Sequence, residues 1–107
     1  MITAAIMPFT SIAKDRAAAL SAVDVRALIA EAKKYPTWVR PVSGSFSTLE
    51  DIEGFILAGT PQDIVRDTRA YERAGADHIV YDLRLRYADW YEQIDLLGKE
   101  VLPALKA

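Results

Sequence analysis

The sequence contains no cysteine and only one histidine, His78, among its 107 residues. The absence of cysteine excludes disulfide bonds, thiolate metal ligands and cysteine nucleophiles. A single histidine does not make a metal site, which needs several converging ligands. Apolar runs are short as well: none approaches the ~18 residues that a membrane-spanning helix needs, and no basic segment of the kind that opens a signal peptide follows Met1. We therefore expect a cytoplasmic protein without a metal site or a membrane contact.

An excess of charge of one sign is also missing. The 13 Lys and Arg residues face 15 Asp and Glu residues, which gives a formal net charge of −2, so the cationic excess that drives nonspecific nucleic-acid binding is absent. Arg66, Arg69 and Arg73 share one predicted helical face, but acids are interleaved with them, which favours a solvated surface. We expect no nucleic-acid partner. The 51% of hydrophobic residues is typical of a folded domain.

The clearest local pattern predicts a helix over residues 61–74. Thr60 is a good N-cap residue, and Pro61 suits the first helical position because its missing N–H would be unpaired there anyway. Asp63 stands where the acid of a capping box reaches back to the N-cap. Gly75 follows the helix and is expected to end it.

Further signals predict an alternation of strands and helices along the chain. Ser21 with Asp24 and Thr48 with Asp51 resemble capping boxes that open helices, and Pro8 is expected to end the first strand. The expected elements are a strand over 2–9, a helical segment over 15–20, a helix over 22–35, a loop over 36–47, a short helix from Thr48 to Gly54, a strand over 55–58, the helix over 61–74, a strand over 78–83 and a helix over 89–105. Such an alternation predicts one α/β domain, residues 1–107, with a parallel sheet.

The helix predicted over 89–105 has the most regular apolar spacing. Its expected buried stripe is Trp90, Tyr91, Ile94, Leu97, Gly98, Val101, Leu102 and Leu105. Trp90 and Tyr91 are therefore assigned to the core and not to a surface that stacks bases. Pro103 lacks an N–H and is expected to kink this helix or to end it early.

Candidate site residues follow from the rule that parallel sheets carry their chemistry at the carboxyl ends of the strands. This edge should hold Phe9 and Thr10, the turn 59–61, and the connection 82–86. His78 starts its strand and is expected at the opposite end. The sequence contains no Ser-His-Asp order, HExxH motif, P-loop or GxGxxG motif, so no catalytic residue is assigned.

Two alternatives stay open at each candidate position. The helix N–H groups that follow Gly59 and Thr60 could bind an anion or a phosphate, or Thr60 could serve only as a helix cap. Asp82, Arg84 and Arg86 could bind a polar substrate or a cofactor tail, or they could form an ion pair on a surface connection.

Three stretches of the sequence resemble the luciferase-like flavin-dependent oxidoreductases. Residues 56–65 (Ile-Leu-Ala-Gly-Thr-Pro-Gln-Asp-Ile-Val) and 71–80 (Tyr-Glu-Arg-Ala-Gly-Ala-Asp-His-Ile-Val) are similar to the C-terminal part of that family. Residues 97–105 (Leu-Gly-Lys-Glu-Val-Leu-Pro-Ala-Leu) are similar to its last barrel helix. The resemblance implies that the chain is three consecutive βα units, the sixth to the eighth of a (β/α)8 TIM barrel.

The resemblance also implies an oxidoreductase or monooxygenase that uses FMN or the deazaflavin F420 on a small organic substrate. Gly59, Thr60 and Arg84 are its candidate cofactor-binding residues. A complete barrel needs at least ~200 residues, so the units that precede these would be absent from the chain. Three strands alone would leave sheet edges exposed, and proteins cover or pair such edges. We therefore expect a homo-oligomer or a complex with a complementing N-terminal chain.

Three hypotheses of function remain after these observations. The first is the C-terminal portion of a luciferase-like flavin- or F420-dependent oxidoreductase, incomplete as an isolated catalyst. The alternative is a non-catalytic βα assembly module, or a truncated remnant, without cofactor binding. A third is an unrelated small α/β domain that binds a phosphorylated ligand at Thr60.

Overall fold

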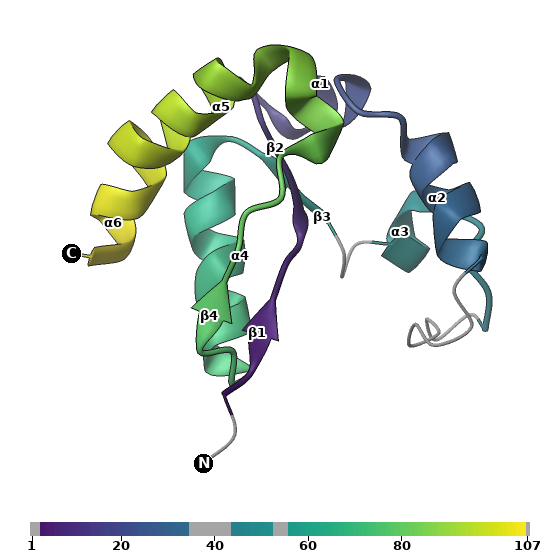
Figure 1. The fold of residues 1–107 in the computed structure, drawn as a ribbon, viewed down its shortest axis with the longest axis horizontal. Helices are drawn as coiled ribbons and strands as arrows, with labels where there is room; N and C mark the ends of the chain where they lie inside the picture. Colours follow the sequence, from purple (N-terminus) through teal and green to yellow (C-terminus); the bar gives the residue numbers. More distant parts are fainter. Residues whose placement is uncertain (1–2, 35–43, 53–55, 107) are drawn as a thin grey trace.

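The computed structural model describes residues 3–34, 44–52 and 56–106, and its helices and parallel strands confirm the predicted α/β class (Figure 1). The strands are β1 (Ala5–Ile6), β2 (Phe9–Ile12), β3 (Ile56–Gly59) and β4 (His78–Ile79). The α-helices are α1 (Arg16–Ser21), α2 (Val25–Lys33), α3 (Leu49–Ile52), α4 (Pro61–Arg73), α5 (Trp90–Leu96) and α6 (Leu102–Lys106). A 3-10 helix, η2 (Arg84–Asp89), leads into α5, and a π-helical segment, η3 (Leu97–Val101), joins α5 to α6.

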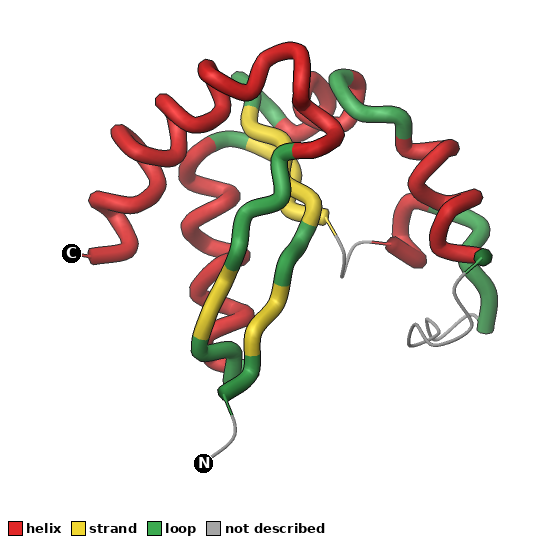
Figure 2. The backbone as a smooth tube through the Cα atoms, viewed as in Figure 1, coloured by secondary structure: helices red, strands yellow, loops and turns green. Residues whose placement is uncertain are grey.

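The strands form two short parallel pairs, joined by one bridge, around the first stretch of the chain. β1 pairs with β4, and β2 pairs with β3. The two pairs meet where Phe9 bridges to Asp82: the Thr10 N–H donates to the Asp82 carbonyl at 2.8 Å, and the Asp82 N–H donates to the Pro8 carbonyl at 3.0 Å. The β1–β2 stretch therefore lies in the middle, because β4 pairs with β1 and β3 pairs with β2. Figure 2 shows β1 and β4 side by side in yellow.

Pro8 interrupts the first strand, as expected, but the strand does not end there, because pairing resumes in β2. The parallel register places the backbone nitrogen of residue 8 opposite the carbonyl of Val80, and proline has no N–H to donate. The neighbouring bond, from the Val80 N–H to the Ile6 carbonyl at 2.9 Å, is intact. A single missing ladder bond thus divides the strand into β1 and β2 and shortens β4, predicted over 78–83, to two residues, while pairing resumes in β2.

The order of the strands bears on the expected barrel segment. In consecutive barrel units each strand lies beside the strand that precedes it in the chain, which would place β3 between the first strand and β4. Here the first strand separates β3 from β4. A first strand flanked on both sides is typical of doubly wound open sheets. The structure therefore shows an α/β fold with short parallel strands, and it does not show a part of a TIM barrel.

The predicted capping box of Ser21 with Asp24 is wrong, because α1 extends through Ser21. Asp15 caps α1, its Oδ1 accepting from the Ala18 N–H at 2.7 Å. Asp24 is itself the N-cap of α2, and its Oδ1 accepts from the Ala27 N–H at 2.9 Å. The helix predicted over 22–35 therefore begins at Val25. Its expected end and the loop residues up to position 43 lie outside the described residues.

The helix predicted after Thr48 is present as α3. The Asp51 Oδ2 accepts from the N–H groups of Ser47 and Thr48, each at 2.9 Å. Asp51 therefore reaches back as a capping-box acid does. The expected end at Gly54 lies outside the described residues.

The helix predicted over 61–74 is confirmed as α4, which follows β3 directly. Gly75 ends it with a φ of +109°, the left-handed region that favours glycine. The Gly75 N–H donates to the Glu72 carbonyl and the Ala76 N–H donates to the Tyr71 carbonyl, both at 3.0 Å. These two bonds form a Schellman motif, which satisfies the last carbonyls of α4.

The helix predicted over 89–105 is continuous but changes its winding at η3. The Leu102 N–H donates to the Leu97 carbonyl, five residues back, as in a π-helix. Pro103 has no N–H to donate to the carbonyl four residues before it. The π-helical turn before the proline therefore gives up fewer α-helical hydrogen bonds than it would elsewhere in a helix. Among the described residues, no helix is long and apolar enough to cross a membrane.

The core is divided into two clusters by the sheet. One packs α1, α2 and α3 against β3, and its buried members are Ala19, Val23, Leu28, Ala32, Phe46, Ile52, Ile56 and Ala58. The other packs α4 and η3 against the opposite face, and its buried members are Ile12, Leu57, Ile64, Leu97 and Val101. Phe46 thus anchors the end of the loop predicted over 36–47 in the core, at 1% exposure.

Candidate functional site

The turn after β3 carries two of the candidate cofactor residues, Gly59 and Thr60. The Thr60 Oγ1 accepts from the Asp63 N–H at 3.1 Å, and the Asp63 Oδ2 accepts from the Thr60 N–H at 2.9 Å. These bonds confirm the capping box predicted for α4. Gly59 has a φ of +152°, and a Cβ built there would lie 2.7 Å from the Asp63 Cβ. The turn is therefore closed tightly around the side chain of Asp63.

The Asp63 carboxylate stands where an anionic ligand of this helix end would bind. The hydrogen bond from the Thr60 N–H lowers the pKa of Asp63; burial opposes this, and the Thr60 hydroxyl and the Arg66 guanidinium add to the lowering. Asp63 is thus ionised at neutral pH, with Arg66 Nη1 at 2.9 Å from its Oδ1. A helix end binds phosphate through N–H groups that lack an acceptor, whereas this one already holds a carboxylate. The contacts fit a helix cap and do not fit the phosphate of FMN or F420.

Arg84, the third candidate, is engaged by its neighbour Asp82. Its Nη2 lies 2.7 Å from the Asp82 Oδ2, and its Nε donates to the same oxygen at 2.8 Å. The guanidinium also lies 5.1 Å from the centroid of the Phe9 ring, a distance typical of a cation–π contact. These contacts match the ion-pair alternative for Arg84.

The structure does not bring Arg84 together with Gly59 and Thr60. Gly59 pairs with Ile12, whereas Asp82 bridges to Phe9, three residues earlier on the central strand. At roughly 3.3 Å per residue this is about 10 Å along the sheet, and the two positions flank opposite sides of that strand. Arg84 lines cavities of 480 and 270 Å³, and neither Gly59 nor Thr60 lines them.

The carboxyl end of the central strand is sealed by Gln93 of α5. The Gln93 Oε1 accepts from the Ile12 N–H at 2.8 Å, and its Nε2 donates to the Ile12 carbonyl at 3.0 Å. The side-chain amide thus forms the two bonds that the peptide group of a neighbouring strand would form. Both Gln93 and Ile12 are buried, at 0% and 1% exposure. The position where ligands usually meet a parallel sheet is therefore filled by the protein itself.

Arg86 completes this seal from η2. Its Nη1 donates to the Ser11 Oγ at 2.9 Å and to the Ile12 carbonyl at 3.2 Å, and its Nη2 lies 3.2 Å from the Asp89 Oδ2. The Ser11 hydroxyl in turn donates to the Ala19 carbonyl at 2.7 Å. Arg86 is 8% exposed, and its Nε has no hydrogen-bond partner among the described residues. The expected site residue Arg86 thus ties η2 to the sheet.

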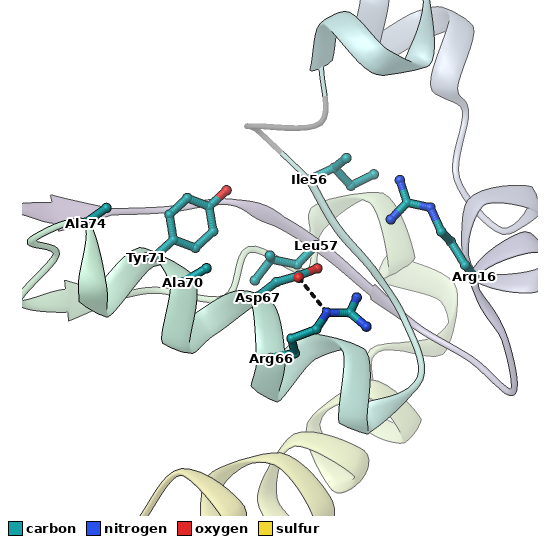
Figure 3. A pocket seen from close by; sticks show the side chains of 8 residues that line it. All are labelled: Arg16, Ile56, Leu57, Arg66, Asp67, Ala70, Tyr71 and Ala74. Carbon is teal, nitrogen blue, oxygen red and sulfur yellow. Dashed lines mark hydrogen bonds and ion pairs between the residues drawn. The ribbon is translucent and has the colours of Figure 1, made fainter.

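A separate cavity of 460 Å³ lies between α4, β3 and the start of α1 (Figure 3). Its charged lining is Arg16, Arg66 and Asp67, and Arg66 Nε lies 3.2 Å from Asp67 Oδ1. Burial and the nearby Asp67 carboxylate raise the pKa of Tyr71, so its hydroxyl stays protonated at neutral pH. The described lining contains no serine, histidine or cysteine.

His78 lies at the amino-terminal end of the sheet, paired with Ala5 and exposed, as expected. Among the described residues, no group of three or more His, Cys, Asp or Glu side chains could hold a metal ion.

The buried stripe expected on the last helix is wrong at Trp90, Tyr91, Ile94, Gly98 and Leu102, which are all exposed. Leu97 and Val101 are buried with Gln93, but Trp90 and Tyr91 are 41% and 78% exposed. Their ring centroids lie 4.8 Å apart. The burial of Gln93 rotates the stripe, because the polar contact with the strand turns that residue inward and the aromatic residues outward.

These aromatic residues belong to a larger surface, here named the apolar surface. Its exposed members are Met7, Val80, Tyr87, Trp90, Tyr91, Ile94 and Leu102. Met7, Val80, Tyr87 and Trp90 line the 480 Å³ cavity together, and Leu102 lines a 230 Å³ cavity with Ile79 and Tyr81. Tyr81 lines both cavities, so the two parts of the surface meet at the segment that follows β4.

Comparison with protein-family models, with curated proteins and with solved structures finds no match for this chain. Sequence reasoning missed Gln93 altogether, because a lone glutamine inside an amphipathic helix carries no signal that it will face a strand. Sequence reasoning also missed the apolar surface. Periodicity identifies which face of a helix is apolar, but it does not show whether another element covers that face.

Proposed function

We propose that the chain is a non-catalytic α/β assembly module, whose role is to join another polypeptide through the apolar surface. One observation carries the proposal: seven large apolar side chains, Met7 between β1 and β2 and the others on the segment after β4, η2, α5 and α6, are 41–79% exposed. At about 150–250 Å² for a fully exposed side chain of this size, they present roughly 800 Å² to water. The largest apolar patch on an ordinary monomer is about 300–600 Å².

The candidate site residues support this proposal over catalysis by the isolated chain. Gly59 and Thr60 are closed by Asp63, Arg84 is paired with Asp82, and Gln93 fills the end of the sheet. A small-molecule site gathers several polar groups in one pocket, and these residues are dispersed instead.

A polar double substitution on the apolar surface, Trp90→Gln with Ile94→Gln, tests the proposal. Because 41% of Trp90 and 44% of Ile94 are exposed, we expect the free energy of unfolding to fall by only about 1 kcal/mol for each substitution, while association measured by sedimentation is weakened. The matched control is Leu97→Gln on the buried side of the same helix, where an unpaired amide in the core costs several kcal/mol. If the double variant loses as much stability as Leu97→Gln, these residues belong to the core of the chain and the proposal is refuted.

The resemblance to luciferase-like oxidoreductases supports a second proposal. The blocks that carry it include the capped helix α4 and the strand β3 before it, and the chain would then supply the C-terminal portion of such an enzyme, with FMN or F420 held largely by the complementing chain. Titration with FMN and with F420, followed by flavin fluorescence and by melting temperature, tests this. Saturable binding that raises the melting temperature would favour the enzyme. No binding to a folded chain would favour the assembly module.

A further inference from the structure

The outer edge of β4 offers unpaired backbone groups along the apolar surface. The N–H groups of His78, Val80 and Asp82 donate to the central strand. Because alternate residues of a strand point their N–H and carbonyl groups to opposite sides, those of Ile79 and Tyr81 point to the outer edge. Among the described residues, no acceptor is found for the Tyr81 N–H. A strand edge of this kind pairs readily with a further strand.

The residues along this edge are complementary to themselves in the antiparallel direction. If two copies meet about a two-fold axis at Val80, then Ile79 of each lies opposite Tyr81 of the other, and the outward backbone groups of both bond reciprocally. Val80 then faces its own counterpart, which suits an exposed apolar side chain. His78 lies opposite Asp82 of the second copy, whose carboxylate is already bound by Arg84 of its own chain.

The area of the apolar surface also suits a pair of identical chains. A stable interface of standard size buries about 800 Å² on each partner, which is close to the roughly 800 Å² that the seven side chains expose. Two-fold dimers are the commonest oligomers, and in them one patch on each subunit covers the same patch on the other. The surface around β4 contains both the open edge and the apolar side chains that such a contact requires.

We propose that the chain forms a two-fold dimer in which β4 pairs antiparallel with β4 of a second copy and the apolar surfaces cover each other. This inference rests on the proposed role as an assembly module and names its partner. The two sheets then join into one continuous sheet, with Val80 on the axis.

Sedimentation of the full chain over a concentration series, together with two charge variants, tests the dimer. We expect a species of twice 11.9 kDa for the unaltered chain. Val80→Lys and Val80→Glu each place like charges opposite each other on the axis, which is destabilising in a cross-strand pair, so each variant alone should be monomeric. Because lysine would face glutamate in a mixed pair, mixing the two variants should restore a dimer. Ala30→Lys on the exposed side of α2 is the control and should leave the mass unchanged.

The outcomes separate this inference from the proposed function. A chain that stays monomeric at all concentrations, or a dimer that Val80→Lys does not weaken, overturns pairing through β4. If the dimer resists Val80→Lys but is lost in the Trp90→Gln, Ile94→Gln variant, the assembly role stands and the β4 contact is refuted. Two monomeric charge variants that fail to associate when mixed would show that the defect is not charge repulsion on the axis, and would also overturn the two-fold arrangement.

Discussion

Replacing Gln93 with methionine should lower the free energy of unfolding by about 2 kcal/mol, because the substitution removes a buried acceptor and leaves the side-chain length nearly unchanged. The Ile12 N–H, 1% exposed, would lose the Gln93 Oε1 at 2.8 Å, and a buried donor without a partner costs about 1–3 kcal/mol. The Ile12 carbonyl loses less, since Arg86 Nη1 still donates to it at 3.2 Å. The unpaired N–H therefore dominates the cost.

Chemical denaturation followed by circular dichroism measures this change, at one protein concentration because assembly would add to the apparent stability. A domain of this size loses roughly 4–8 °C of melting temperature per kcal/mol, so a fall of about 8 °C or more is expected. The Ile12 amide should also exchange faster with deuterium. The only other glutamine, Gln62, is exposed on α4, and Gln62→Met should stay within about 0.5 kcal/mol of the unaltered chain. Equal stability of the Gln93→Met and Gln62→Met variants would refute the strand-like role of Gln93.

Three further predictions concern α4 and its neighbours. Gly59→Ala should destabilise the fold by at least about 1–3 kcal/mol, measured by denaturation, because alanine is strained at a φ of +152° and its Cβ meets Asp63; an unaffected variant would mean that the turn can open. The folded-state pKa of Asp63 lies below 3.8, so its stabilising effect is complete above that pH and is lost as pH falls through the folded pKa. The Asp63→Asn variant should therefore lose less stability on acidification than the unaltered chain. Burial raises the pKa of Tyr81 above 10, so its contribution to stability is complete below pH 10 and is lost as pH rises through the folded pKa. Tyr81→Phe also removes the 2.8 Å bond to Thr68 and should cost about 1 kcal/mol at neutral pH. In a pH titration of stability, this variant should lose less stability at alkaline pH than the unaltered chain.

Local signals were sufficient wherever neighbouring residues decide the structure. The helix over 61–74 was predicted with its cap and its end, because Thr60, Asp63 and Gly75 lie within hydrogen-bonding reach of the backbone groups that they satisfy. The α/β class followed in the same way from alternating helix and strand patterns. These features require no knowledge of what lies across the molecule.

The candidate site could not be predicted in the same way, because it depends on which strands are neighbours. The central place of the first strand separates Gly59 from Arg84, and a chain order of strands and helices is compatible with several strand orders. Pro8 illustrates the same limit: its missing N–H matters only because Val80 lies opposite.

The sequence by itself determined the start and end of α4, the absence of thiol chemistry and the α/β class, since each follows from composition or from contacts within a few residues. The tertiary structure alone decided that Gln93 is buried while Trp90 and Tyr91 are exposed. Hydrophobic periodicity predicts the reverse, because it assigns the side chains that transfer most favourably from water to the buried face. At a buried strand edge, the side chain that can hydrogen-bond the unpaired backbone groups is favoured instead. The Ile12 edge, 81 residues away in sequence, is satisfied by the side-chain amide of Gln93.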